Sequence, residues 1–166
     1  KAVEILYDRG FVIKLILLNS IHPAPISQVE QNKLHTYILK SKIRNNIYFD
    51  SEYLEDTQII SILEQSDIVV FPYQNTQESS SAAARFGLMS LRPVLTTPLE
   101  IFDDIKNITY QTKGFDPVDI ANAIIDISQA EHDSKKQHEV INNNSWDKIS
   151  LKLYNMIYSK YWELKP

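Results

Sequence analysis

A run of small and polar residues between two apolar segments is the part of this sequence best suited to bind an anion. Residues 78–85 read ESSSAAAR, between the segments 67–72 (DIVVFP) and 92–97 (RPVLTT). Small side chains at the start of a helix leave the first-turn N–H groups reachable, and the helix dipole favours a negative charge there. The sequence therefore predicts a helix N-terminus that faces a phosphate group.

Composition restricts the classes of protein and site that fit this chain. With 166 residues and 43% hydrophobic content, the chain can bury one substantial core, so we expect a single domain over residues 1–166. The net charge of −4 argues against nucleic-acid binding, which needs a concentrated basic surface. There is no cysteine, and the four histidines show no paired ligand spacing, so we expect neither a metal nor a cofactor. No apolar run approaches the roughly 20 residues that cross a bilayer, and we expect a cytoplasmic protein.

Strand and helix patterns alternate along the whole chain. The expected strands are 12–18, 46–49, 67–72, 93–97 and 108–110. The expected helices are a short one from Ala2 that Gly10 closes, one from 27 to about 42, one capped by Asp56 or Thr57, one over 79–91, one that Asp116 and Pro117 begin, and one capped by Ser145. This alternation predicts an α/β fold, a Rossmann-like parallel sheet with helices on both faces.

Apolar spacing also predicts which surfaces are buried. The run 12–18 is typical of a strand covered on both faces. Two helical stripes are expected to face the core, one formed by Ile120, Ile124 and Ile127 and the other by Trp146, Ile149, Leu153, Ile157 and Tyr161. Lys135 and Lys136 are expected on the solvated surface.

Three segments, taken in order, resemble the donor-binding C-terminal domain of a GT-B glycosyltransferase of the retaining group-1 (GT4-like) family. Residues 66–72 (SDIVVFP) resemble the strand before that family's donor loop, and 92–97 (RPVLTT) its next strand. Residues 145–149 (SWDKI) resemble the opening of its terminal helix. The resemblance covers nearly all of the chain, and it implies the C-terminal half of a GT-B fold.

The resemblance assigns a role to Glu78 and exposes one departure from the family pattern. Glu78 matches the first of two family glutamates and would be the catalytic residue that contacts hydroxyls of the transferred sugar. The second glutamate position is Phe86 here, which removes the usual carboxylate contact to the ribose, and we expect Phe86 in the core. Arg85 is the candidate substitute.

The chemistry that the resemblance implies also needs groups that stabilise a leaving diphosphate. As the glycosidic bond of a nucleotide-sugar breaks, negative charge grows on the diphosphate, and donors placed there lower the barrier. Ser79, Ser80 and Ser81 offer N–H groups and hydroxyls, and Arg85 offers a cationic fork. Each has a structural alternative: a serine that only caps the helix, an arginine paired with a carboxylate, and a glutamate that only interacts with the dipole.

Three further residues are candidates for substrate binding. Tyr73 and Tyr53 lie near expected strand ends and could stack on a nucleobase, with simple packing as the alternative. His22 follows an expected strand at its carboxyl end, where α/β sheets place ligands, with a role in the turn as the alternative.

The resemblance further implies that residues 1–166 are a fragment of a longer enzyme. In the resembling domains, another strand precedes the helix that starts at Ala2, and a separate N-terminal domain binds the acceptor. We expect the fragment alone to be inactive, because transfer requires both substrates to be held together. We also expect an unpaired sheet edge, a gap, or pairing with a second copy as a homo-oligomer.

The favoured function is a glycosyltransferase donor domain that binds a nucleotide-diphosphate sugar for transfer to a glycan or lipid-linked acceptor, in surface polysaccharide biosynthesis. A lipid-linked acceptor would bring the protein to the inner face of the membrane. One alternative is a nucleotide-sugar epimerase-like enzyme, which is disfavoured because no histidine–carboxylate constellation is evident. The other is a non-catalytic α/β interaction module.

Overall fold

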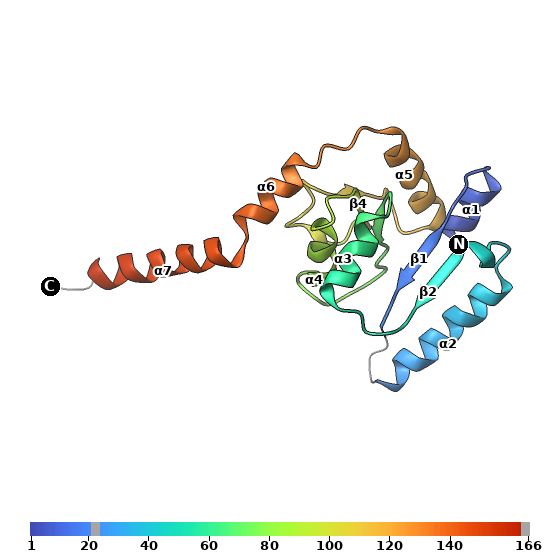
Figure 1. Ribbon diagram of the computed structural model, residues 1–166, viewed down its shortest axis with the longest axis horizontal. Coiled ribbons are helices and arrows are strands. Elements are labelled where there is room, and N and C mark those ends of the chain that lie inside the picture. The colour runs from blue at the N-terminus through green and yellow to red at the C-terminus, as the bar shows by residue number, and fades with distance from the viewer. Residues whose placement is uncertain (21–23, 164–166) are drawn as a thin grey trace.

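The computed structural model describes residues 1–20 and 24–163 and contains two parallel ladders of strands flanked by helices (Figure 1). In the first ladder, β1 (Leu15–Leu18) pairs with β2 (Ile47–Asp50), with Leu15 opposite Ile47. Helix α1 (Ala2–Asp8) precedes β1, and α2 (Pro25–Lys40) with the 3-10 turn η1 (Arg44–Asn46) connects the two strands.

The second ladder has the order β3 (Val69–Phe71), β4 (Val94–Thr96) and β5 (Tyr110–Gln111), all parallel. Helix α3 (Asp56–Glu64) leads into β3, α4 (Ala82–Leu88) connects β3 with β4, and the 3-10 turn η2 (Glu100–Phe102) lies between β4 and β5. Helices α5 (Pro117–Gln129), α6 (Lys135–Asn143) and α7 (Trp146–Glu163) follow. The predicted α/β class, with parallel strands between helices, is therefore confirmed.

Local signals in the sequence fix two helix ends where they were expected, whereas α3 is capped by Glu55, in a capping box with Gln58, and not by the predicted Asp56 or Thr57. Gly10 has a φ of +87° and closes α1, with its N–H donating to the Tyr7 carbonyl at 2.9 Å. The N–H of Phe11 donates to the Leu6 carbonyl at 3.1 Å, which completes a Schellman-type end. Asp116 is the N-cap of α5, with Pro117 in its first turn, as predicted.

The core that supports the second ladder lies around α4 and η2. Its buried members are Val69, Ala84, Leu88, Val94, Ile101, Phe102 and Ile105. Gly87 allows α4 to approach β3 closely, because a Cβ added there would lie 2.7 Å from Cε2 of Phe71. A second cluster joins Leu95 to Ile120 and Ile127, which confirms the predicted inner face of α5.

The predicted strand at 12–18 is wrong in extent and burial. β1 covers only Leu15–Leu18, all four residues are half-buried, and Val12 is 99% exposed. Within the described residues β1 pairs with β2 alone, so its other edge lacks the neighbouring strand that would bury it. Helix α4 is also shorter than the predicted 79–91, and α2 starts two residues earlier than predicted, at Pro25.

The predicted burial of the stripe on the last helix is also wrong for Trp146, Ile149, Leu153 and Ile157, while the side chain of Tyr161 lies outside the described part of the structure. Helix α7 forms as expected, but Trp146 is 86% exposed, and Ile149, Leu153 and Ile157 are exposed as well. Figure 1 shows the reason, because α7 extends away from the body of the molecule beyond α6. Helical spacing predicts a continuous apolar face but not whether another element covers it. None of the described helices has the length and apolar character needed to span a membrane.

Candidate functional site

Three loops meet at the carboxyl edge of the β3–β4–β5 ladder. The hydroxyl of Thr97, directly after β4, donates to the Tyr73 carbonyl at 2.6 Å. The side-chain amide of Gln74, in the loop after β3, donates to the Phe115 carbonyl at 3.3 Å, in the loop after β5. These contacts fix the loop 72–81, which carries most of the candidate residues, at the edge where α/β sheets bind ligands.

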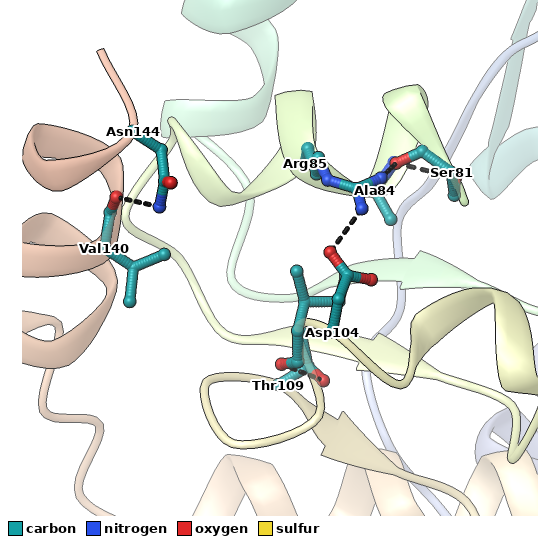
Figure 2. Close-up of polar contacts among 8 residues, drawn as sticks. Ser81, Ala84, Arg85, Asp104, Thr109, Val140 and Asn144 are labelled. Atoms are coloured by element: carbon teal, nitrogen blue, oxygen red, sulfur yellow. Dashed lines mark hydrogen bonds and ion pairs between the residues drawn. The ribbon is translucent and has the colours of Figure 1, made fainter. Parts of the chain in front are cut away.

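Ser81 is the N-cap of α4 and is nearly fully buried. Its Oγ accepts from the Ala84 N–H at 3.1 Å (Figure 2) and lies 3.4 Å from the Tyr73 hydroxyl. The hydroxyl is therefore engaged in the cap, in agreement with the structural alternative for this residue. Because α4 has only seven residues, an anion there would depend on individual N–H groups and on Arg85 more than on a long helix dipole.

Glu78, Ser79 and Ser80 are exposed next to this cap. The N–H of Glu78 donates to Oγ1 of Thr76 at 3.1 Å, which shapes the turn before α4. Within residues 1–20 and 24–163, the hydroxyls of Ser79 and Ser80 make no hydrogen bond. Both hydroxyls and the Glu78 carboxylate are thus accessible to a ligand.

Arg85 places its guanidinium at the amino end of α4. One terminal nitrogen donates to the Ser81 carbonyl at 3.0 Å, and the other forms an ion pair with Asp104 (Figure 2). Both side chains are accessible, with 41% of Arg85 and 47% of Asp104 exposed. Asp104 lies in the segment after η2, and no local pattern in the sequence indicates its pairing with Arg85, because the two residues are 19 positions apart.

The aromatic candidates differ in their surroundings. Tyr73 is half-buried, with its ring centroid 6.3 Å from Phe71 and 5.3 Å from Phe102, so its ring packs beneath the loop. Tyr53 is 82% exposed in the loop after β2. Phe86, expected in the core, is only half-buried. His22 lies outside the described residues.

A second polar cluster, which sequence reasoning missed, joins α1 to α2. The Tyr37 hydroxyl donates to one carboxylate oxygen of Glu4 and the Ser41 hydroxyl to the other, both at 2.6 Å. The hydrogen bonds from Ser41 and Tyr37 lower the pKa of Glu4, while burial and the bond to Glu4 raise the pKa of Tyr37 to about 12. The partners are more than 30 positions apart, so no local pattern indicates them.

Two cavities lie away from the segment 72–85. One, of about 670 Å³, is open to solvent and lined by residues of α1, Lys42 and the start of α5, and the other, of about 520 Å³, is an open depression on α2. The first contains both lysines and carboxylates, and among the described residues no group of His, Asp and Glu side chains could hold a metal ion. None of the candidate residues in the segment 72–85 lines either cavity.

No family model matches the sequence, and the curated proteins include no significant match. Solved structures do show the same fold. A glycosyltransferase from Rickettsia africae is 18% identical with a TM-score of 0.76, and the match covers 99% of this chain and 43% of that one. Sucrose-phosphate synthase from Thermosynechococcus elongatus is 13% identical with a TM-score of 0.75, covering 99% and 42%. α,α-Trehalose 6-phosphate synthase from Burkholderia multivorans is 9% identical with a TM-score of 0.70, covering 99% and 40%.

These similarities confirm the predicted Rossmann-like fold as that of one region of glycosyltransferases. At such identities the likeness is one of fold. The chain spans about two-fifths of the length of each of these structures.

Proposed function

We propose that this chain is the donor-binding domain of a retaining, group-1-type glycosyltransferase that binds a nucleotide-diphosphate sugar. The observation that carries the proposal is the group of accessible residues on the amino side of α4, namely Glu78, Ser79, Ser80 and Arg85. They lie at the carboxyl edge of a parallel sheet, on a fold shared with glycosyltransferases.

In this proposal two groups of side chains bind different parts of the donor, and the charge of each group decides which part it binds. Ser79 and Ser80 donate to the diphosphate, and Arg85 neutralises the charge that develops as the glycosidic bond breaks. Glu78 would repel a diphosphate, so its carboxylate accepts from sugar hydroxyls. Ser81 contributes through the cap that orders the turn.

The nucleobase needs a surface outside this group. Tyr53 is the best candidate, because its ring is exposed in the loop after β2. We also propose that His22, which follows β1 in the sequence, contacts the donor. Tyr73 supports the loop from below, since its ring is packed on Phe71 and Phe102.

We further propose that the domain works within a longer enzyme whose other domain binds a glycan or lipid-linked acceptor. The uncovered apolar face of α7 supports this, because such a face is normally packed against protein. The described β1–β2 and β3–β4–β5 ladders are not hydrogen-bonded to each other, and their unpaired edges suit a further strand, from the longer protein or from a second copy. We place the enzyme in the cytoplasm, at the inner face of the membrane where the acceptor is lipid-linked, in polysaccharide biosynthesis.

Titration of the chain with UDP, GDP and ADP, followed by sugar nucleotides of the base that binds, tests the proposal. Glu78→Gln should not weaken binding of the free diphosphate, since it removes a repelling charge, and it should remove the extra affinity that the sugar provides. Glu139→Gln, at an exposed glutamate on α6, is the matched control and should change neither. If Glu78→Gln and Glu139→Gln bind the sugar nucleotide equally, the proposed sugar contact is wrong.

A non-catalytic interaction module is the second candidate function. It is favoured by the structural contacts of Ser81, which caps α4, and of Arg85, which pairs with Asp104, because both side chains already have partners within the protein. Such a module would bind none of UDP, GDP and ADP. The epimerase-like alternative has less support, because His132 lies against the Leu91 carbonyl, Gln137 and Tyr110, and none of these is a carboxylate.

A further inference from the structure

The cation assigned to the leaving diphosphate already has an anionic partner. The Arg85 guanidinium pairs with Asp104, and roughly half of each side chain is exposed to solvent. A diphosphate that approaches Arg85 must therefore compete with a carboxylate of the protein itself. A single exposed ion pair is weak, so an incoming anion of higher charge can displace it.

The position of the guanidinium does not depend on Asp104 alone. Arg85 also donates to the Ser81 carbonyl at 3.0 Å, one turn back along α4. This second contact keeps the guanidinium at the amino end of the helix, where long helical side chains naturally point. Release of Asp104 would thus free one terminal nitrogen of the guanidinium for a ligand, while the other nitrogen stays bonded to the Ser81 carbonyl.

We infer that Asp104 regulates this site as an internal counter-ion, which occupies Arg85 in the free protein and yields it to the donor diphosphate. The inference rests on the proposed function, because it assumes that the diphosphate is held at Arg85. Asp104 lowers the affinity for the diphosphate by competing for Arg85, and it therefore favours release of the nucleoside diphosphate after transfer.

The neighbouring aspartate provides a matched control. Asp103 pairs with Lys106 at 3.4 Å and is similarly exposed, so it lies in the same segment and does not pair with Arg85. Asp103→Asn and Asp104→Asn remove the same charge from adjacent positions. A general change in surface potential would affect both variants alike, whereas displacement from Arg85 is specific to Asp104.

The test is isothermal titration of the full chain and of Asp104→Asn, Asp103→Asn, Arg85→Gln and the Arg85→Gln/Asp104→Asn double variant. The probe is whichever of UDP, GDP and ADP binds the unmodified chain. Asp104→Asn should tighten binding about two- to fivefold, as expected from loss of one exposed ion pair. Asp103→Asn should give less than half of this gain, and high salt should reduce the gain. In the Arg85→Gln background, Asp104→Asn should have no effect.

Three results would overturn the inference while leaving the proposed function in place. The first is diphosphate binding that Asp104→Asn leaves unchanged or weakens. The second is an equal gain in affinity from Asp103→Asn, and the third is a gain from Asp104→Asn that persists in the Arg85→Gln background. If neither the unmodified chain nor any variant binds a diphosphate, the proposed function fails, and this inference fails with it.

Discussion

The Tyr73 hydroxyl lies 3.4 Å from Oγ of Ser81, so the loop after β3 is joined at its beginning to the cap at its end. The same Oγ accepts from the Ala84 N–H, and the Tyr73 carbonyl accepts from Thr97. The turn that presents Glu78, Ser79 and Ser80 is therefore held by residues that are buried or, in the case of Tyr73, half-buried. We expect Ser81 to determine stability and the two preceding serines to determine ligand binding.

Ser81→Ala should destabilise the chain by about 1 kcal/mol, because it removes a helix cap and a partner of Tyr73. Ser80→Ala, one residue away and exposed, should change the free energy of unfolding by less than ~0.5 kcal/mol. Urea denaturation of both variants measures this difference. Equal losses in the two variants would contradict the role assigned to the Ser81 hydroxyl.

Gly87→Ala should destabilise the chain by about 1–3 kcal/mol, although alanine favours a helix, because its Cβ would lie 2.7 Å from the Phe71 ring. Phe71→Leu in the same chain should recover part of the loss by making room for the new methyl group. Thermal and urea unfolding of the single and double variants check this coupling. Additive losses would show that α4 does not approach β3 as closely as described.

The Glu4 cluster predicts a specific dependence of stability on pH. Its hydrogen bonds lower the pKa of Glu4 in the folded state, so its contribution is present above the unfolded value near 4.5 and is lost as the pH falls through the folded pKa. Glu4→Gln should therefore be less stable than the unmodified chain at pH 7, with the difference narrowing below pH 4.5. Urea unfolding across this range measures the gap, and a gap independent of pH would argue against the charged cluster.

The raised pKa of Tyr37 predicts the opposite sign at high pH. The contribution of its neutral hydroxyl is complete below the unfolded pKa of 10 and is lost as the pH rises through about 12. Tyr37→Phe should remove this dependence. Fluorescence-monitored unfolding at pH 9 and pH 11 would detect it, and an unchanged profile in Tyr37→Phe would assign the effect to another group.

The exposed face of α7 predicts an unusual tolerance to polar substitution. Leu153→Ser should change the stability of this chain by less than ~0.5 kcal/mol, because the side chain is already in solvent. Ile127→Ala, in the cluster with Leu95, should cost about 2–5 kcal/mol. A large loss from Leu153→Ser would mean that α7 is covered in solution.

The features that could be predicted from the sequence depend on local chemistry. Gly10 needs a left-handed backbone, Asp116 and Pro117 suit a helix start, and the spacing of Ile120 and Ile127 defines one helix face. The parallel direction of the strands could be predicted because strands and helices alternate along the chain.

The features that were missed depend on residues distant in the chain. Spacing at Trp146 indicates an apolar face, but its exposure depends on whether another element packs there. The pairing of Arg85 with Asp104 is a tertiary contact with no local signature. The exposure of an apolar helix face and the partner of a charged side chain both depend on the whole fold, so only the structure could assign them.

The most direct test of the central claim is an NMR titration of the ¹⁵N-labelled chain with UDP, GDP and ADP. The proposal predicts that at least one diphosphate shifts the backbone amides of residues 79–82 and the Arg85 side-chain signal in a saturable way. Absence of saturable shifts with all three, or shifts confined to the cavity between α1 and α5, would contradict it.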